Sequence, residues 1–300
     1  MGAGAIGSLF GGYLKKSGQD VILIGKEWNV KPIKEHGLEL VPFNSEDTLN
    51  IKIEATTDPA TCGFQDLVIL TVKAYDTKSA LIDAEPIIKS GHTRILCLQN
   101  GYGTEIIASQ LYGKSSTLRG VTSHGAVITP GHVIHTGLGD TFIGQLDPNT
   151  KIDDIIEIFN QANIKTKFVE NIQDIIWSKV LVNASINPFG ALTKLRNGQL
   201  LENSDIVECM KQVIREGVNV LNSHGIKLNI NNAIENAIRV AKMTALNKNS
   251  MLQDIEKGRR TEIDYINKAI SELGKENGIK TPMNYLLTAL IKGLEYSIKN

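Results

Sequence analysis

The stretch that decides the fold is Gly2-Ala3-Gly4-Ala5-Ile6-Gly7, a Gly-x-Gly-x-x-Gly pattern that opens a helix-like segment at 6–17. Glycines at this spacing permit a tight turn and a close approach of the backbone to a pyrophosphate at the helix N-terminus. Glycine-rich turns are common, so the pattern alone is weak evidence. An apolar run at 21–25 strengthens it, because the run comes at the spacing of a second strand in a Rossmann unit. We predict that a dinucleotide cofactor binds to Gly2, Gly4, Ala5, Ile6 and Gly7.

The first half of the chain alternates short apolar runs with helix-like stretches, which is typical of an open α/β sheet. Near-continuous hydrophobicity predicts parallel strands covered on both faces, at 21–25, 67–72 and 95–98. Helices are expected at 6–17 and 78–89. Runs broken by Gly and Pro predict antiparallel strands added to this sheet at 120–128, 132–136 and 141–144, with hairpin turns at 130–131 and 137–140.

After residue 170 the pattern becomes helical. Amphipathic periodicity predicts helices at 172–186, 205–223, 230–244, 253–273 and 282–298. We therefore expect an α/β protein with an N-terminal Rossmann-like dinucleotide-binding domain, residues 1–168, and a C-terminal all-helical domain, residues 169–300. No low-complexity linker separates them, so the two are expected to pack closely.

One element of the Rossmann unit is missing, since only Met1 precedes the glycine pattern where the first, central strand should stand. Without that strand, its neighbours would have unpaired backbone groups. Three explanations are open: the start codon is assigned too late, the chain has been shortened, or a strand from elsewhere replaces the missing one. The 300-residue chain is expected to be less stable and to bind a dinucleotide poorly, and adding Met-Lys-Ile-x-Ile-x before Gly2 is expected to restore both.

Composition excludes several classes of protein. The chain has 32 Lys and Arg against 32 Asp and Glu, so no global positive field attracts a nucleic acid or an anionic membrane. The apolar runs are far shorter than the ~20 residues of a membrane span. Three scattered cysteines form neither a disulfide framework nor a zinc pattern and suit a reducing cytoplasm. No metal site is predicted.

Cofactor choice depends on the residues at the end of the second strand, Gly25-Lys26-Glu27, where no acid ends the strand itself. A cation at this position suits the 2′-phosphate of NADPH, although Glu27 leaves the preference open. The alternative is an ordinary solvated surface lysine.

A polar stripe carries the chemistry. Lys179, Asn183 and Asn187 are spaced by four, so on a helix they share one face that is otherwise largely apolar. Burial lowers the pKa of a lysine, which could then act as a general acid. A structural polar network is the alternative, and Pro188 is expected to kink or end the helix.

A second polar segment covers residues 250–264. Ser250 with Gln253 three residues later resembles a capping box, which is a structural explanation for the serine. Glu262 is expected on the same helix three turns later, on a partly apolar face that invites a ligand or a buried partner.

Together these segments resemble the ketopantoate reductase (2-dehydropantoate 2-reductase) family along nearly the whole chain. The resemblance rests on GAGAIG at 2–7, VKAYDT at 72–77, LQNGYGTE at 98–105, KVLVNASINP at 179–188 and the block at 247–267. It implies NADPH-dependent reduction of 2-dehydropantoate to (R)-pantoate on the route to coenzyme A, in a site between the two domains. It also implies a cytoplasmic enzyme and allows a homodimer.

The resemblance also assigns roles to matching positions. Lys179 would be the general acid and Glu262 would bind the substrate hydroxyls. The substrate would be held by Asn183, Asn187, Asn247 and Ser250. Lys73 and Asn100 would flank the nicotinamide end of the cofactor, and Lys26 would read the 2′-phosphate, where the family often has arginine.

Two alternatives remain open. One is a related NADPH-dependent reductase of another branched 2-oxo acid. The other is a non-catalytic dinucleotide-binding relative that has lost turnover with its first strand.

Overall fold

The computed structural model describes residues 1–299, and contacts divide the chain into two compact units. Unit 1 comprises residues 1–99 and 103–172, and unit 2 comprises residues 100–102 and 173–300. These units are defined by contacts within the structure. The division into domains at residue 168 stays a prediction.

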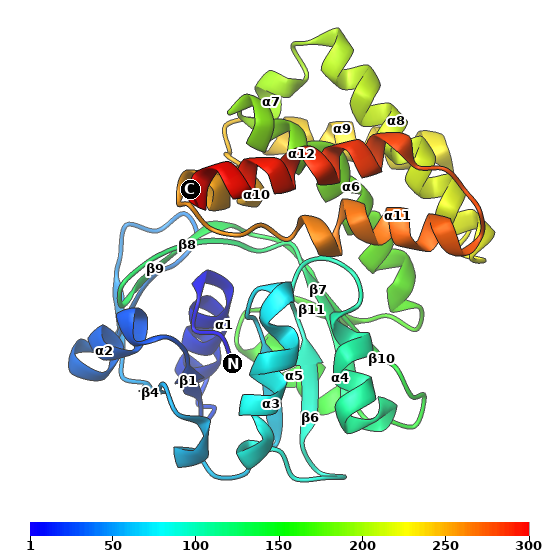
Figure 1. Ribbon diagram of the computed structural model, residues 1–300. Helices are drawn as coiled ribbons and strands as arrows, with labels where there is room; N and C mark the ends of the chain where they lie inside the picture. The colour runs from blue at the N-terminus through cyan, green and yellow to red at the C-terminus, as the bar shows by residue number, and fades with distance from the viewer. Residues whose placement is uncertain (300) are drawn as a thin grey trace. The chain divides into compact units, whose positions relative to one another are not determined.

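Unit 1 contains a five-stranded sheet in the order β11-β10-β7-β6-β5, of which Figure 1 labels β6, β7, β10 and β11. Its strands are β5 (Leu67–Leu70), β6 (Arg94–Cys97), β7 (Thr117–Thr122), β10 (Thr141–Gln145) and β11 (Thr166–Phe168). β5, β6 and β7 run parallel, whereas β10 is antiparallel to β7 and parallel to β11. The apolar runs predicted as strands form β5 and β6, and Leu70, Ile95 and Leu96 are fully buried.

The helices of unit 1 include the one predicted after the glycine pattern. They are α1 (Ala5–Lys16), α2 (Glu27–His36), α3 (Thr77–Asp83), α4 (Thr104–Tyr112) and α5 (Asp153–Gln161). Single 3-10 turns are η1 (Pro59–Thr61), η2 (Ala74–Asp76), η3 (Glu85–Ile87) and η4 (Lys114–Ser116). The helix expected over 78–89 ends at Asp83, because Pro86 lacks the N–H that would continue it, and η3 takes its place.

The antiparallel strands were only partly predicted correctly. β8 (Gly125–Thr129) and β9 (His132–Gly137) form the expected hairpin around Pro130-Gly131. They do not join the main sheet, however, but a second one, β3-β2-β9-β8, with β2 (Leu38–Val41) and β3 (Leu49–Ile51). The hairpin covers α1, where Tyr13 bonds to His135, so burial of α1 competes with extension of the main sheet. Residues 137–140 therefore link two sheets and form no hairpin.

The predicted gap in the Rossmann sheet is present in unit 1. β1 (Ile22–Ile24) pairs with β4 (Glu54–Thr56), and within residues 1–299 no strand lies between β1 and β5. Met1 crosses one end of the gap: its amine donates to the carbonyl of Ile69 at 2.8 Å, and its carbonyl accepts from the amide of Thr71 at 2.9 Å. Burial lowers the pKa of that amine to about 5.

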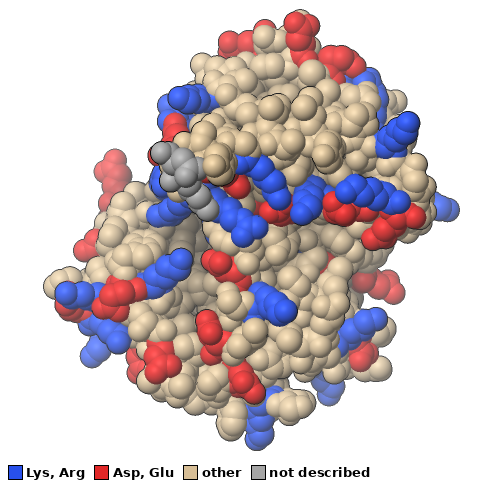
Figure 2. Space-filling view, in the orientation of Figure 1, with Lys and Arg blue, Asp and Glu red and all other residues tan. Residues whose placement is uncertain are grey.

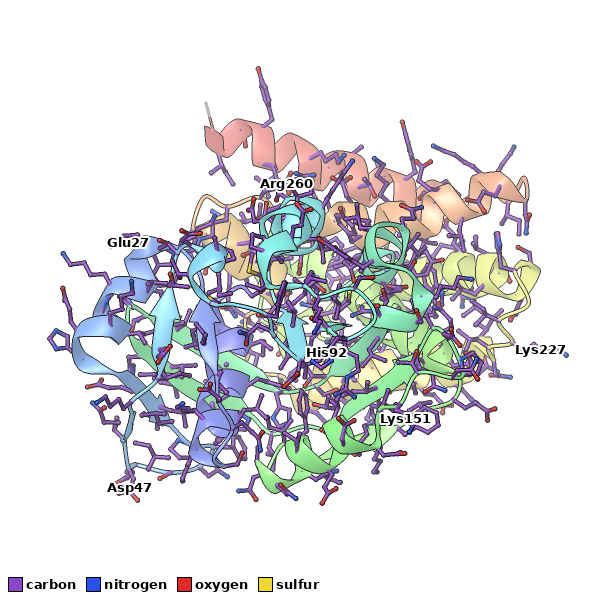
Figure 3. The ribbon with its side chains drawn as sticks, turned by 90° about the horizontal axis from the view of Figure 1, so that it is seen from below. Glu27, Asp47, His92, Lys151, Lys227 and Arg260 are labelled. Atoms are coloured by element: carbon purple, nitrogen blue, oxygen red, sulfur yellow. The ribbon has the colours of Figure 1, made fainter. Side chains whose placement is uncertain are left out.

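Below Met1 the gap opens into a groove. Its volume is about 650 Å³, and its walls include Phe10, Val21, Leu67 and Phe159. His92 and Lys151 also line it and are labelled in Figure 3. The described residues thus supply no replacement strand, and the groove defines the space that a strand would fill.

Unit 2 is helical apart from its loops. Its helices are α6 (Ile172–Thr193, whose first residue belongs to unit 1), α7 (Asn197–Leu200), α8 (Ser204–Ser223), α9 (Ile230–Met243), α10 (Ser250–Glu256), α11 (Asn267–Glu276) and α12 (Pro282–Lys299), with a 3-10 turn η5 (Ile263–Tyr265). α8 packs against α9, α11 and α12, and α11 packs against α12.

Two helix predictions in unit 2 were wrong. α6 does not end at Pro188 but continues to Thr193. The long helix expected over 253–273 is instead α10, a loop, η5 and α11. The break is caused by Gly258, whose φ of +64° ends α10, so Glu262 lies just ahead of η5 and not on a helix face.

Surface charge and helix hydropathy decide which other partners a protein can bind. On the face shown in Figure 2, basic and acidic side chains are interspersed and neither forms a broad patch. Across residues 1–299, no helix is both long and apolar enough to cross a membrane. The same residues contain no group of three His, Cys, Asp or Glu side chains arranged to hold a metal ion.

Candidate active site

The glycine turn in unit 1 has the geometry that the sequence pattern predicts. A Cβ on Gly2 would lie 2.5 Å from the amide nitrogen of Val72, and a Cβ on Gly7 would clash with the carbonyl oxygen of Gly2. Gly4, in contrast, faces open space, with the nearest atom 4.0 Å from such a Cβ. Gly4 is also the N-cap of α1, where no side chain accepts from the first-turn amides. The turn therefore fits an approaching pyrophosphate with Gly4, Ala5, Ile6 and Gly7 at the helix N-terminus.

Two lysines border this turn within unit 1. Gly25 separates Lys26 from the end of β1, and Lys26 is the exposed N-cap of α2. A Cβ on Gly25 would lie 2.6 Å from the Cβ of Ala3. Lys73 lies after the strand β5 on the other side and is half-buried at the start of η2. The predicted cofactor residues of unit 1 thus gather at the carboxyl edge of β1 and β5, where ligands of open α/β sheets bind.

The candidate catalytic group of unit 2 is a chain of three side chains. Lys179 Nζ donates to Asn100 Oδ1 at 2.8 Å, and Asn100 Nδ2 donates to Glu262 Oε2 at 3.3 Å. Lys179 is half-buried on α6, and Glu262 is only 5% exposed. The amide of Asn100 uses its acceptor on the cation and its donor on the anion, so it holds a proton donor and a carboxylate at a fixed separation. Such a pair can protonate one oxygen of a ligand and accept a hydrogen bond from another.

The loop that carries Asn100 is held within unit 2 although its neighbours in sequence belong to unit 1. The amide of Tyr102 donates to the carbonyl of Tyr265 at 2.9 Å, and the rings of Tyr102 and Trp177 contact each other at a tilt of 32° with centroids 4.3 Å apart. A Cβ on Gly101 would lie 2.6 Å from the Cβ of Tyr265, so only glycine permits this approach. Trp177 is fully buried and anchors this loop.

Glu262 is positioned by its neighbour. Thr261 donates through its amide at 2.7 Å and its hydroxyl at 2.6 Å to Glu295 Oε1 on α12. The hydroxyl of Thr261 also accepts from the amide of Ile263 at 3.3 Å. The backbone on both sides of Glu262 is therefore held in place, and the bond from Asn100 Nδ2 orients its carboxylate. Four residues of this site were not predicted from the sequence: Gly101, Tyr102, Tyr265 and Glu295. The two glycines of the NGYG segment at 100–103 were the signal that could have indicated this loop.

The rest of the predicted stripe lies on α6. Asn183 is half-buried and Asn187 is 5% exposed, and both lie beyond Lys179 at helical spacing in the unbroken helix. Amide groups on a largely apolar helix face can donate to and accept from a polar ligand, so the stripe suits such a ligand.

Two predicted substrate residues, Asn247 and Ser250, are exposed. The N-cap of α10 is Asn249, whose Oδ1 accepts from the amide of Leu252, so the capping box expected for Ser250 was wrong by one residue. A Cβ on Gly190 would clash with Asn249 Nδ2, so the start of α10 packs against the last turn of α6. The substrate roles of Asn247 and Ser250 stay predictions.

Comparisons with known proteins agree with this arrangement. The family model of the N-terminal part of the ketopantoate reductase PanE/ApbA family matches residues 1–148, and the model of its C-terminal part matches residues 171–295. The chain therefore belongs to the ketopantoate reductase family. A 2-dehydropantoate 2-reductase of Pyrococcus abyssi is 41% identical over 98% of this chain and 96% of its own length. The enzyme of the same name from Pyrococcus horikoshii is 40% identical over the same shares.

Solved structures show the same fold. A ketopantoate reductase of this family from Ralstonia eutropha JMP134 superposes with a TM-score of 0.92 at 30% identity, covering 100% of this chain and 98% of the other. A D-mandelate dehydrogenase in complex with NADH and anilino(oxo)acetate superposes with a TM-score of 0.94 at 31% identity, covering 99% and 97%. The α/β fold with a helical second part and a dinucleotide-dependent oxidoreductase family are thereby established.

Proposed function

We propose that this chain reduces the ketone of 2-dehydropantoate to the hydroxyl of (R)-pantoate with NADPH. The observation that carries the proposal is the hydrogen-bonded chain from Lys179 through Asn100 to Glu262. Its support from relatives is the 2-dehydropantoate 2-reductases that match along almost the whole chain.

Each residue of the site has its own part in the reaction. When bound at the glycine turn, the dinucleotide supplies the hydride. Lys179 donates a proton from Nζ to the ketone oxygen, so the carbonyl becomes a hydroxyl without a free alkoxide. Glu262 accepts a hydrogen bond from a substrate hydroxyl, and Asn183 and Asn187 bind its carboxylate. Asn100 holds Lys179 with its ammonium hydrogens directed, which favours a productive geometry.

The preference for NADPH rests on Lys26. An exposed cation two residues after the end of β1 favours a 2′-phosphate through a charge-assisted contact, where an acid would instead bind the ribose hydroxyls. Glu27 is the acidic residue in the first turn of α2. It follows the N-cap Lys26, so it is compatible with a preference for NADPH.

A second candidate is reduction of another 2-oxo acid. Its support is the D-mandelate dehydrogenase with NADH and anilino(oxo)acetate, which superposes over nearly the whole chain. The third, a non-catalytic dinucleotide-binding relative, is suggested by the groove beside β1.

The test is a substrate panel with purified protein. We expect oxidation of NADPH with 2-dehydropantoate at a kcat/KM well above that with phenylglyoxylate or 2-oxoisovalerate. A higher value for an aromatic or another branched 2-oxo acid would favour the second candidate. Binding of NADPH without turnover on any of them would favour the third.

The cellular setting is inferred from the same reaction. Placement on the route to coenzyme A implies a cytoplasmic enzyme, and we propose a homodimer. Light scattering on the eluting protein tests the homodimer, and a monomer at micromolar concentration would exclude it.

A further inference from the structure

We propose that Asn267 is a positioning residue for the substrate-binding face of α6, because it supplies the hydrogen-bond donor that Pro188 lacks. The inference rests on the proposed function, since it assigns a purpose to the continuation of that helix past Pro188.

The vacancy is a consequence of the sequence. In an α-helix each amide donates to the carbonyl four residues earlier, so residue 188 should donate to Ala184. Proline has no amide hydrogen, and its ring crowds that same carbonyl, which normally kinks or ends a helix. α6 nevertheless runs on to Thr193, and Ala184 is fully buried, so no bulk water is available to its carbonyl.

Asn267 fills this vacancy. Its Nδ2 donates to the carbonyl of Ala184 at 3.1 Å and also to Asn284 Oδ1 at 3.1 Å. Asn267 is fully buried as the first residue of α11, so the bond is shielded from water. One side chain, distant in sequence, therefore completes the backbone ladder at the proline.

The donor is itself held in place by a buried network. Asn284 Nδ2 donates to Glu216 Oε2 at 2.8 Å and to the carbonyl of Val213 at 3.2 Å, which orients its Oδ1 toward Asn267. The carboxylate of Glu216 also accepts from the amides of Met283 at 2.9 Å and Asn284 at 3.0 Å, at the N-terminus of α12. α8, α11 and α12 thus converge on one carbonyl of α6.

The location explains why this matters for function. Ala184 lies directly after Asn183, and Pro188 lies directly after Asn187, so the missing rung separates the two amides that we assign to the substrate. Loss of the Asn267 donor leaves the carbonyl unsatisfied, and the helix relieves it by bending or admitting water. Asn187 then moves relative to Lys179. A displacement of about 1 Å in a positioned group can cost about 100-fold in rate.

The experiment compares three variants in the full chain. Asn267→Leu keeps the volume and removes the donor, and it is expected to raise the KM for 2-dehydropantoate about 10- to 100-fold without changing the Kd of NADPH. Pro188→Ala restores a backbone donor to Ala184, so the double variant Pro188→Ala/Asn267→Leu should recover most of the KM. Thr281→Val is the control, because it removes a buried hydrogen bond of 3.1 Å to Ser271 in the same helical layer without touching α6.

A purely structural role would give another pattern. If Asn267→Leu and Thr281→Val raised the KM equally, or if Pro188→Ala did not restore it, the proposal would be overturned. Hydrogen–deuterium exchange of residues 184–193 gives a readout that does not depend on the substrate: it should accelerate in Asn267→Leu and slow again in the double variant. If the native chain reduces no 2-oxo acid, the proposed function fails, and the exchange result alone decides whether Asn267 holds the helix.

Discussion

Filling the groove between β1 and β5 should stabilise unit 1 strongly. The perturbation is an N-terminal extension, Met-Lys-Ile-Val-Ile, fused ahead of Met1. The edges of both strands face the groove without an intervening strand, and its volume of about 650 Å³ has apolar walls such as Phe10 and Leu67. In the extended chain the nitrogen of Met1 becomes an amide that can still donate to Ile69.

The magnitude can be worked out from burial and order. Four buried apolar side chains contribute about 6–12 kcal/mol, and ordering about five residues costs about 7 kcal/mol. New main-chain hydrogen bonds add about 1 kcal/mol each. A net gain of about 5 kcal/mol corresponds to a rise in Tm of about 10–20 °C for a chain of this class. The glycine turn would also be fixed from below, so the Kd for NADPH should fall.

Thermal unfolding and NADPH titration of both forms provide the assay. A matched extension, Met-Lys-Asp-Gly-Asp, has the same length but cannot bury apolar side chains, and it should leave the Tm unchanged. If the apolar extension melts and binds NADPH like the 300-residue chain, the groove does not accept a strand and this reasoning is refuted.

The remaining predictions concern single side chains. Lys179→Ala should lower kcat about 10²- to 10⁴-fold with an unchanged Kd for NADPH, and an ordinary turnover would exclude it as the proton donor; Lys227→Ala, an exposed lysine in Figure 3, is the control. Glu262→Ala should raise the KM for the substrate more than it lowers kcat, and an unchanged KM would contradict its assignment. Lys26→Ala should weaken the binding free energy of NADPH by about 1–3 kcal/mol and leave that of NADH unchanged. Fluorescence titration of both cofactors can show this. Burial, and then the nearby His135, lower the pKa of His124 to about 4. The unfolded chain therefore binds the proton first, and stability should fall from pH 6.5 toward pH 4 by about 1–2 kcal/mol after solvent screening, with a flatter profile in His124→Asn.

Local sequence patterns predicted most of the helices and strands. Two prolines show where such patterns no longer predict the end of a helix. Pro86 lacks an N–H, and the helix predicted over 78–89 ends ahead of it at Asp83. Pro188 removes the same group, yet α6 continues, because the donor comes from Asn267. That compensation lies 83 residues away from Ala184 and leaves no local signal. Residue periodicity could therefore predict α6 but not its length.

The candidate site shows the same division. Helical spacing alone grouped Lys179 with Asn183 and Asn187, since all lie on one element. Asn100 and Glu262 join Lys179 through contacts that span 79 and 162 residues, and only the family resemblance brought them together beforehand. For Glu262, the helix period was misleading, because Gly258 had already ended α10.

The three residues Asn100–Tyr102 have a consequence for recombination between relatives. They pack with unit 2 but are encoded inside unit 1, so the chain passes from one unit to the other at 99–100, 102–103 and 172–173. A crossover at residue 172 would join the Tyr102 of one parent to the Trp177 of another and would separate Asn100 from the Lys179 and Glu262 with which it evolved. Active chimeras should therefore take residues 100–102 and the C-terminal half from the same parent. The residues that must be exchanged together are thus encoded in two separate segments of the gene.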